Sequence, residues 1–140
     1  MDNDKPYPLP QTSQFTAQFW DGCQRQVLEV PQCQSCNHLF LPGGPVCPKC
    51  WSRKLGSRLA SGRGSVFSYV VYHRSYHPAI PAPYVVAIIE LVEGVRLVSN
   101  IIGCTPKSVS IGMAVQVVFE KVGAAESDFM LPKFKPVGED

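Results

Sequence analysis

Two Cys-x-x-Cys pairs restrict what this 140-residue chain can fold into more than any other feature of its sequence. They are Cys33 with Cys36 and Cys47 with Cys50, and ten residues separate the two pairs. One pair brings two sulfur atoms to the same ion at about 2.3 Å, and two pairs complete a tetrahedron with no open position. A closed site of four thiolates is typical of a structural metal. The sequence therefore predicts a structural metal, zinc, and a segment that folds around it.

Ligand type alone does not select the metal, because sulfur-only tetrahedral sites also accept iron. Two disulfides or a thioredoxin-like redox pair are alternatives, but paired motifs with Gly-Pro turns between them favour a metal. His38 is not expected to be a ligand, since four cysteines already fill the shell. The other cysteines, Cys23 and Cys104, lie in apolar surroundings and are expected to be small buried side chains.

A single helix is expected in an N-terminal segment of residues 1–28. Apolar residues recur within residues 12–27 at spacings that describe one helical face, namely Phe15, Phe19, Trp20, Cys23 and Val27. Thr12 or Ser13 is the candidate cap at its start. This face could pack on the core of the chain itself. Alternatively, its adjacent aromatic residues, Phe19 and Trp20, could form an interface with another subunit.

Residues 29–60 are interpreted as a metal-binding ribbon. An edge strand is expected over residues 27–32, because the segment is β-branched at both ends and contains Pro31. Between the cysteine pairs, residues 39–41 suggest a short apolar strand, and the Pro-Gly-Gly-Pro run of residues 42–45 indicates a turn-rich loop. After Cys50, the pattern suggests a basic linker with Arg53, Lys54 and Arg58.

Residues 61–140 are expected to form the main β domain. Val-, Phe- and Tyr-rich runs predict strands at 64–73, 84–91 and 95–102, then a helical turn at 105–109, then strands at 114–120 and 129–134. Three strands, a short helical connection and two further strands is the order of the OB-fold, a five-stranded partly open barrel. A small sandwich fits the same strand count. The fold class is thus mainly β, with a helix, a rubredoxin-like ribbon and a barrel.

Charge and composition narrow the function classes. The formal net charge is only +2, which is far from the strongly basic footprint of most nucleic-acid binders. No apolar window is long enough for a membrane span, and the N-terminus does not read as a secretory signal, so a reducing cytoplasm is the expected compartment. Motifs of hydrolases, metalloproteases and nucleotide-binding enzymes are missing. The chain is therefore not expected to be catalytic alone.

One small group of polar residues is a candidate ligand edge. His73 and Arg74 end the first strand of the main domain, and His77 follows in the next loop. An imidazole and a guanidinium at one edge of a barrel could contact a phosphate or a thioester carbonyl. The alternative is that the strand ends in ordinary solvated side chains.

Several short segments of the sequence, taken together, resemble one known family. They are Pro-Val-Cys-Pro-Lys-Cys at 45–50, Ser-Gly-Arg-Gly-Ser-Val-Phe-Ser-Tyr at 61–69, Pro-Tyr-Val-Val-Ala-Ile-Ile-Glu-Leu at 83–91, Asn-Ile-Ile-Gly-Cys at 100–104, Ile-Gly-Met at 111–113 and Leu-Pro-Lys-Phe at 131–134. This order is similar to the acyl-CoA-associated proteins that join a rubredoxin-like zinc ribbon to an OB-fold. The sequence departs from the family at Trp51, which stands where a glycine is common, and at Gln26.

The resemblance implies a non-catalytic accessory subunit of a thiolase-like enzyme, such as a thiolase, a retro-aldolase or another acyl-CoA condensing or cleaving enzyme. Such subunits help to hold the CoA thioester, as in bacterial steroid side-chain breakdown, which is part of lipid metabolism. Trp51 adds an exposed aromatic residue that could join Phe19 and Trp20 at the partner interface. Two rival hypotheses remain open, a nucleic-acid-binding protein that stacks bases on Tyr69 and Tyr72, and an iron-containing electron carrier.

Overall fold

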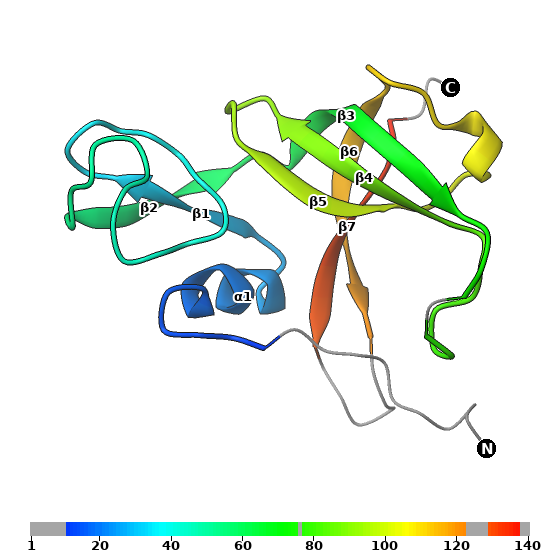
Figure 1. The fold of residues 1–140 in the computed structure, drawn as a ribbon, viewed down its shortest axis with the longest axis horizontal. Coiled ribbons are helices and arrows are strands. Elements are labelled where there is room, and N and C mark those ends of the chain that lie inside the picture. Colours follow the sequence, from blue (N-terminus) through cyan, green and yellow to red (C-terminus); the bar gives the residue numbers. More distant parts are fainter. Residues whose placement is uncertain (1–10, 76, 123–128, 138–140) are drawn as a thin grey trace.

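A computed structural model describes residues 11–75, 77–122 and 129–137. It places a small ribbon on one side of a barrel, with one short helix beside both (Figure 1). In chain order the elements are α1 (Ala17–Gln24), β1 (Leu28–Cys33), β2 (Leu55–Ala60), β3 (Arg63–Tyr72), β4 (Tyr84–Leu91), β5 (Arg96–Ile101), the 3-10 turn η2 (Pro106–Ser108), β6 (Ala114–Lys121) and β7 (Met130–Pro136).

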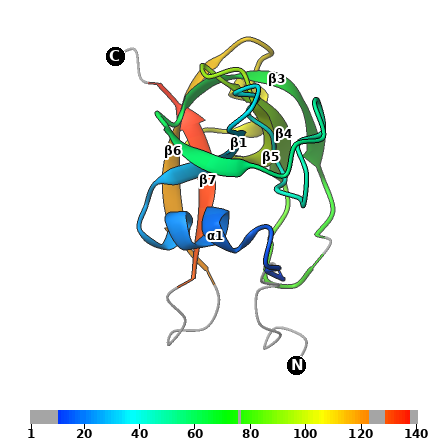
Figure 2. The ribbon, with the colours of Figure 1, turned by 90° about the vertical axis from the view of Figure 1, so that its left-hand side faces the viewer.

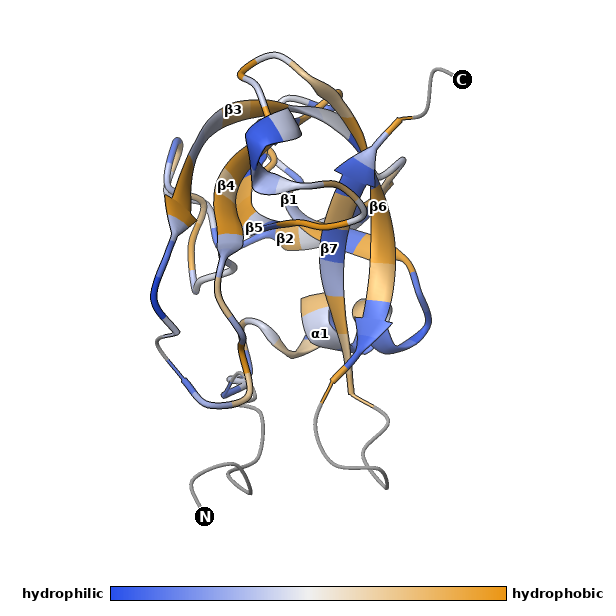
Figure 3. Ribbon diagram, turned by 90° about the vertical axis from the view of Figure 1, so that its right-hand side faces the viewer, coloured by the Kyte–Doolittle hydropathy of each residue, from blue (hydrophilic) through white to orange (hydrophobic). Residues whose placement is uncertain are grey.

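The barrel strands close in the order β3-β4-β5-β7-β6, which confirms the five-stranded OB-fold prediction. Strand β4 shows why it closes around a core, because every second residue of Tyr84–Leu91 is buried. Figure 3 shows hydrophobic residues recurring along β3, β4 and β6. The buried side chains of the barrel are Val66, Val85, Ala87, Ile89, Leu91, Val95, Ile101, Val109, Val115, Val122 and Phe134.

Strand β3 bends so that it can pair with two neighbours. It pairs with β4 along most of its length and with β6 at its start, and a register shift separates Val66 from Ser68. Gly64 lies where these three strands meet, and a Cβ there would approach the backbone oxygen of Glu90 to 2.6 Å. Only a glycine lets β3 and β4 come this close.

Two local predictions for the ribbon differ from the structure. The segment after Cys50 is not simply a linker, because β2 pairs antiparallel with the whole of β1, from Leu28 opposite Ala60 to Cys33 opposite Leu55. No residue of β2 is fully buried, and its sequence, Leu-Gly-Ser-Arg-Leu-Ala, lacks the β-branched and aromatic residues that signal a strand. Residues 39–41 do not form a regular strand, since only Leu39 makes an isolated bridge, to Gln32.

Helix α1 is also shorter than residues 12–27. Its C-terminus is closed by hydrogen bonds from Gln26 N–H to Cys23 O and from Val27 N–H to Gly22 O, both 2.9 Å. This is the Schellman arrangement, which needs a left-handed residue at Gln26, and Gln26 has a φ of 64°. At the other end Ser13 hydrogen bonds within a turn instead of capping the helix.

The side chains of α1 connect the ribbon to the barrel. Gln24 donates its amide N–H to the Met130 carbonyl and accepts the Met130 N–H, at 3.2 and 2.9 Å. On the ribbon side, Glu29 of β1 accepts bonds from Gln18, Arg25 and Ser57. Figure 2 shows the helix beside β7 and β1. In the part of the chain that is described, no helix is long and apolar enough to cross a membrane.

Candidate metal centre and the adjoining cleft

The structure brings all four predicted cysteine ligands together at the tip of the ribbon. Their sulfur atoms lie within 4.8 Å of one another, with 3.5 Å between Cys33 and Cys50 and 3.7 Å between Cys36 and Cys47. A tetrahedron with metal–sulfur bonds of 2.3 Å has edges of about 3.8 Å. No disulfide joins any of these cysteines. The donor set and its spacing fit a four-thiolate metal site, and His38 does not belong to it.

The two halves of the site repeat the same backbone geometry. In the first half, the N–H groups of residues 35 and 36 point at the Cys33 sulfur, and in the second those of residues 49 and 50 point at the Cys47 sulfur. Each turn closes with a bond of 2.9 Å, from Asn37 N–H to Cys33 O and from Trp51 N–H to Cys47 O. Asn37 and Trp51 have φ angles of 66° and 68°. Trp51 therefore adopts the left-handed conformation for which a glycine is suited.

Electrostatics shows why this cluster requires a cation. The N–H groups of Cys36 and Ser35 lower the pKa of the Cys33 thiol to about 6. Burial acts to raise the pKa of Cys47, but the N–H groups of Cys50 and Lys49 outweigh it and lower the pKa. At Cys50 the Ser52 N–H acts to lower the pKa, yet the neighbouring sulfurs raise it to about 12. Four thiolates at these distances therefore need a bound positive charge to coexist.

The other two cysteines take no part in this site. Burial raises the pKa of Cys23 to about 12, and it also raises the pKa of Cys104. Cys23 is fully buried and Cys104 packs against the barrel core. Cys23 agrees with the expectation of a small buried side chain, whereas Cys104 is only half-buried.

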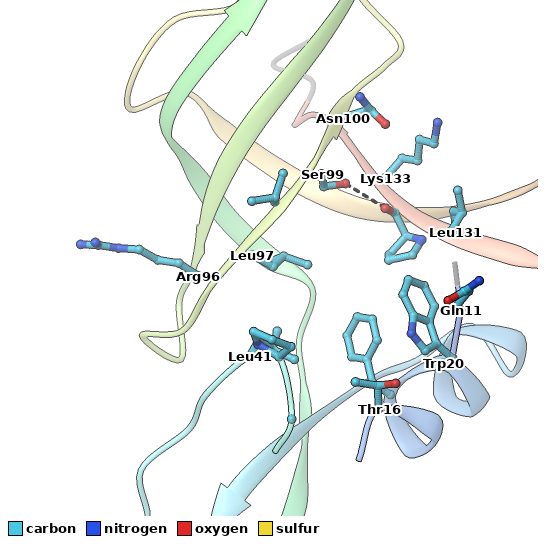
Figure 4. Close-up of a pocket in the computed structure, with 15 residues that line it drawn as sticks. Gln11, Thr16, Trp20, Leu41, Arg96, Leu97, Ser99, Asn100, Leu131 and Lys133 are labelled. Atoms are coloured by element: carbon cyan, nitrogen blue, oxygen red, sulfur yellow. Dashed lines mark hydrogen bonds between the residues drawn. The ribbon is translucent and has the colours of Figure 1, made fainter. Parts of the chain in front are cut away.

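A cleft of about 480 Å³ lies between the helix, the ribbon loop and the barrel (Figure 4). Its residues come from α1, from the Leu41–Pro42–Gly43 loop, from β5 and from β7. In Figure 4 the Trp20 side chain points from the helix toward the barrel strands. Phe19 and Trp20 pack edge to face, with 5.1 Å between ring centroids, and Trp20 lies 5.8 Å from the Phe129 ring.

The remaining predicted site residues are dispersed. His73 and Arg74 are exposed just after β3 and do not line the cleft. Trp51 is 77% exposed at the tip of the ribbon. Phe19 and Trp20 are half-buried against the core cluster and also line the cleft.

This cleft could not be predicted from the sequence, because the residues that line it belong to four separate segments. One of these residues, Lys133, is only 8% exposed and lies 3.2 Å from Glu120. The signal that could have revealed it is the pairing of an apolar helix face with a lysine inside the last strand. That signal has meaning only when the relative position of the two is known.

Comparisons with known proteins identify both parts of the chain. The ChsH2 rubredoxin-like zinc ribbon domain matches residues 20–56, and the ChsH2 C-terminal OB-fold domain matches residues 57–120. A solved structure described as an Ltp2-ChsH2(DUF35) aldolase superposes with a TM-score of 0.84. It is 37% identical, and the match covers 91% of this chain and 98% of that one.

Two curated relatives differ in how much of their own length this chain covers. A DUF35 domain-containing scaffold protein of Methanothermobacter thermautotrophicus is 40% identical over 118 residues, covering 81% of this chain and 89% of the relative. A probable enoyl-CoA hydratase alpha subunit of Thermomonospora curvata is 38% identical over 129 residues, covering 92% of this chain. The chain spans only 40% of the length of that hydratase subunit.

Proposed function

Because the chain belongs to the ChsH2 family of joined zinc-ribbon and OB-fold domains, we propose that it is an accessory subunit of a thiolase-like, acyl-CoA-processing enzyme. In this role it binds the enzyme subunit and helps to hold the acyl-CoA thioester, while the partner supplies the reacting groups. The observation that carries the proposal is the match over 98% of a chain in a structure described as an aldolase with ChsH2.

The arrangement of the possible metal ligands supports a structural role for the metal. Among the described residues, the four cysteines are the one group of His, Cys, Asp or Glu side chains close enough to hold a metal. A closed four-thiolate site leaves no position for a substrate. The metal, which we propose to be zinc, thus stabilises the ribbon and does not act on the substrate.

An apolar surface on the barrel is available for the partner. The outer face of β3, β4 and β5 carries Val70 opposite Val86 and Ile88 opposite Val98, in register across the strands. Val70 and Val98 are 54% and 68% exposed. We call this surface the outer face. Contiguous exposed apolar side chains on a barrel are typical of a protein interface.

Aromatic residues extend the outer face in both directions. Tyr72 and Tyr84 stack with 5.0 Å between their ring centroids, and both are adjacent to the Val70–Val86 row. At the other end the Arg96 guanidinium lies 3.8 Å from the Phe67 ring centroid. Tyr and Arg are enriched among the residues that dominate binding energy at interfaces.

Affinity purification of the tagged chain from its native cells, followed by mass spectrometry, tests this function. We expect a thiolase-like or aldolase-like enzyme to co-elute in stoichiometric amount, and the complex to turn over an acyl-CoA. Recovery of nucleic acid or of a redox protein without any acyl-CoA enzyme would refute the proposal.

The ligand-edge hypothesis for His73 and Arg74 is tested on the same complex. If these residues contact the phosphates or carbonyl of the thioester, His73→Ala and Arg74→Ala should raise KM for the acyl-CoA without changing complex formation. If both complex formation and turnover are unchanged, these residues are only solvated side chains at the end of β3.

A further inference from the structure

The walls of the cleft between α1 and the barrel are mostly apolar. Apolar side chains enter it from the helix, the ribbon loop and strands β5 and β7, namely Phe19, Trp20, Leu41, Pro42, Leu97, Val98, Leu131 and Pro132. Figure 4 shows Leu97 and Leu131 on the barrel side and Trp20 on the helix side of the same space. A volume of about 480 Å³ lies within the range of small-molecule pockets.

Most polar groups that line the cleft already have partners inside the protein. The Ser99 hydroxyl donates to the Pro132 carbonyl at 2.8 Å, and the Asn100 amide donates to the Val85 carbonyl at 2.7 Å. Lys133 is paired with Glu120. A ligand that carries hydroxyl or phosphate groups would find few free partners there, and its own polar groups would lose their water.

Arg96 also has partners inside the protein, and it lies on the outer side of the cleft. Its guanidinium contacts Glu90 at 3.4 Å and covers the Phe67 ring, both on the barrel surface. The cleft thus has an apolar interior, and most of the polar side chains that line it already have partners in the protein. Such an interior suits the hydrocarbon end of a ligand and disfavours its polar end.

From these features we propose that the cleft binds the hydrocarbon part of an acyl-CoA, with the thioester and CoA directed toward the outer face. This inference rests on the proposed function, because an acyl-CoA-processing partner is what would present such a ligand. Val98 belongs to both surfaces, since it lines the cleft and also lies in the Ile88–Val98 row of the outer face. A partner that covers the outer face would therefore also cover the mouth of the cleft.

The two tryptophans of the chain provide a direct measurement. Trp20 lines the cleft, whereas Trp51 lies exposed at the ribbon tip. In a Trp51→Phe variant the remaining fluorescence comes from Trp20 alone. We expect decanoyl-CoA to change this emission saturably and free CoA to leave it unchanged. In the reciprocal Trp20→Phe variant, Trp51 should not respond to decanoyl-CoA.

The affinity for acyl-CoA should depend on the length of the acyl chain. If each methylene enters the apolar cleft, the affinity for hexanoyl-, octanoyl- and decanoyl-CoA should rise by about fourfold per CH₂. A flat series, or equal binding of free CoA, would show that the hydrocarbon is not what the protein recognises and would overturn the inference.

Two aspartate substitutions in the Trp51→Phe background form a matched pair. Val98→Asp and Val92→Asp each introduce a charge at a valine that is exposed to the same extent, but only Val98 lines the cleft, and Val92 lies in the turn between β4 and β5. Val98→Asp should weaken decanoyl-CoA binding tenfold or more, and Val92→Asp should change it less than twofold. Equal weakening by both would indicate general adsorption of the lipid to the barrel surface and would refute the inference.

The same titration on the purified complex separates this inference from the proposed function. If the partner enzyme co-purifies and the complex turns over its substrate, but Trp20 responds to decanoyl-CoA in neither the free chain nor the complex, only the cleft proposal fails. If no acyl-CoA enzyme is recovered but Trp20 responds with the expected chain-length and Val98 dependence, the cleft proposal stands and the subunit role fails.

Discussion

The ribbon and the barrel are both built from antiparallel strands, yet different forces hold them together. Strand β4 of the barrel buries every second side chain, whereas β2 of the ribbon buries none completely. The ribbon instead gathers four sulfur atoms within 4.8 Å. Binding a metal to such a site supplies an apparent free energy of about 10 kcal/mol or more. Coordination thus stabilises the tip of the ribbon, whereas at its base Leu28 and Val30 of β1 are buried in the same core cluster as the barrel side chains.

This difference predicts that the two regions fail independently. Loss of the metal should unfold the ribbon and leave the barrel, and damage to the core should do the reverse. Two features could couple them. Helix α1 bonds to the barrel through Gln24 and to the ribbon through Glu29, and Leu28 and Val30 of β1 are buried in the same core cluster as the barrel side chains.

The largest effect is expected for Cys47→Ser, because it removes a metal ligand. We expect loss of the bound metal and unfolding of the ribbon, at a cost of about 10 kcal/mol of metal-binding free energy. Metal analysis and amide hydrogen exchange would measure it, with fast exchange in β1 and β2 and continued protection in β4. Cys104→Ser is the control, since Cys104 is a cysteine of the barrel outside the metal cluster. Loss of protection throughout the barrel would show that the regions are not independent.

Metal analysis on the wild-type protein also decides between zinc and iron. We expect a colourless protein with one zinc per chain, because the closed thiolate site has a structural role. A coloured protein with bound iron would revive the electron-carrier hypothesis.

A smaller loss of stability, confined to the barrel and not to the ribbon, is expected for Phe134→Ala in β7. Phe134 is 0% exposed in the barrel core, so its truncation should lower the free energy of unfolding by about 3–5 kcal/mol. Urea denaturation followed through barrel amides would measure this loss, while metal content should not change. Val137→Ala, at an exposed position just after β7, should have almost no effect. Release of the metal from folded Phe134→Ala would contradict independent stabilisation.

Glu29→Gln tests the contact between the helix and the ribbon. Burial acts to raise the pKa of Glu29, but bonds from Arg25, Ser57 and Gln18 outweigh it, so the pKa is lowered. The charged carboxylate is therefore the stabilising form, and the variant should lose about 1–2 kcal/mol. Since the folded pKa lies below the unfolded value of about 4.3, the loss should be equal at pH 7 and pH 5.5 and decline only as the pH falls further. Urea titrations at several pH values measure it, and an effect already lost at pH 5.5 would be contrary to this assignment.

The barrel and the ribbon also differ in how well their elements could be predicted from the sequence. The barrel strands were predictable because β3, β4 and their neighbours are rich in β-branched and aromatic residues, and the metal ligands were predictable because Cys-x-x-Cys spacing encodes coordination directly. Strand β2 was missed because it forms by pairing with β1 and carries no such pattern. The cleft was missed because Trp20, Leu41, Leu97 and Leu131 meet only after folding.

The smallest predicted effect concerns Trp51, which closes the second turn of the metal site. Trp51 holds a φ of 68° and is 77% exposed, so its side chain contributes little packing to offset an unfavourable backbone conformation. Trp51→Gly should stabilise the ribbon by about 1 kcal/mol, which corresponds to roughly fivefold tighter metal retention against a competing chelator. Trp51→Ala is the matched control, because it removes the same ring but keeps the backbone strain, and it should not tighten metal binding. If both variants weaken metal retention equally, the indole ring itself stabilises the metal turn, and the ribbon depends on more than coordination.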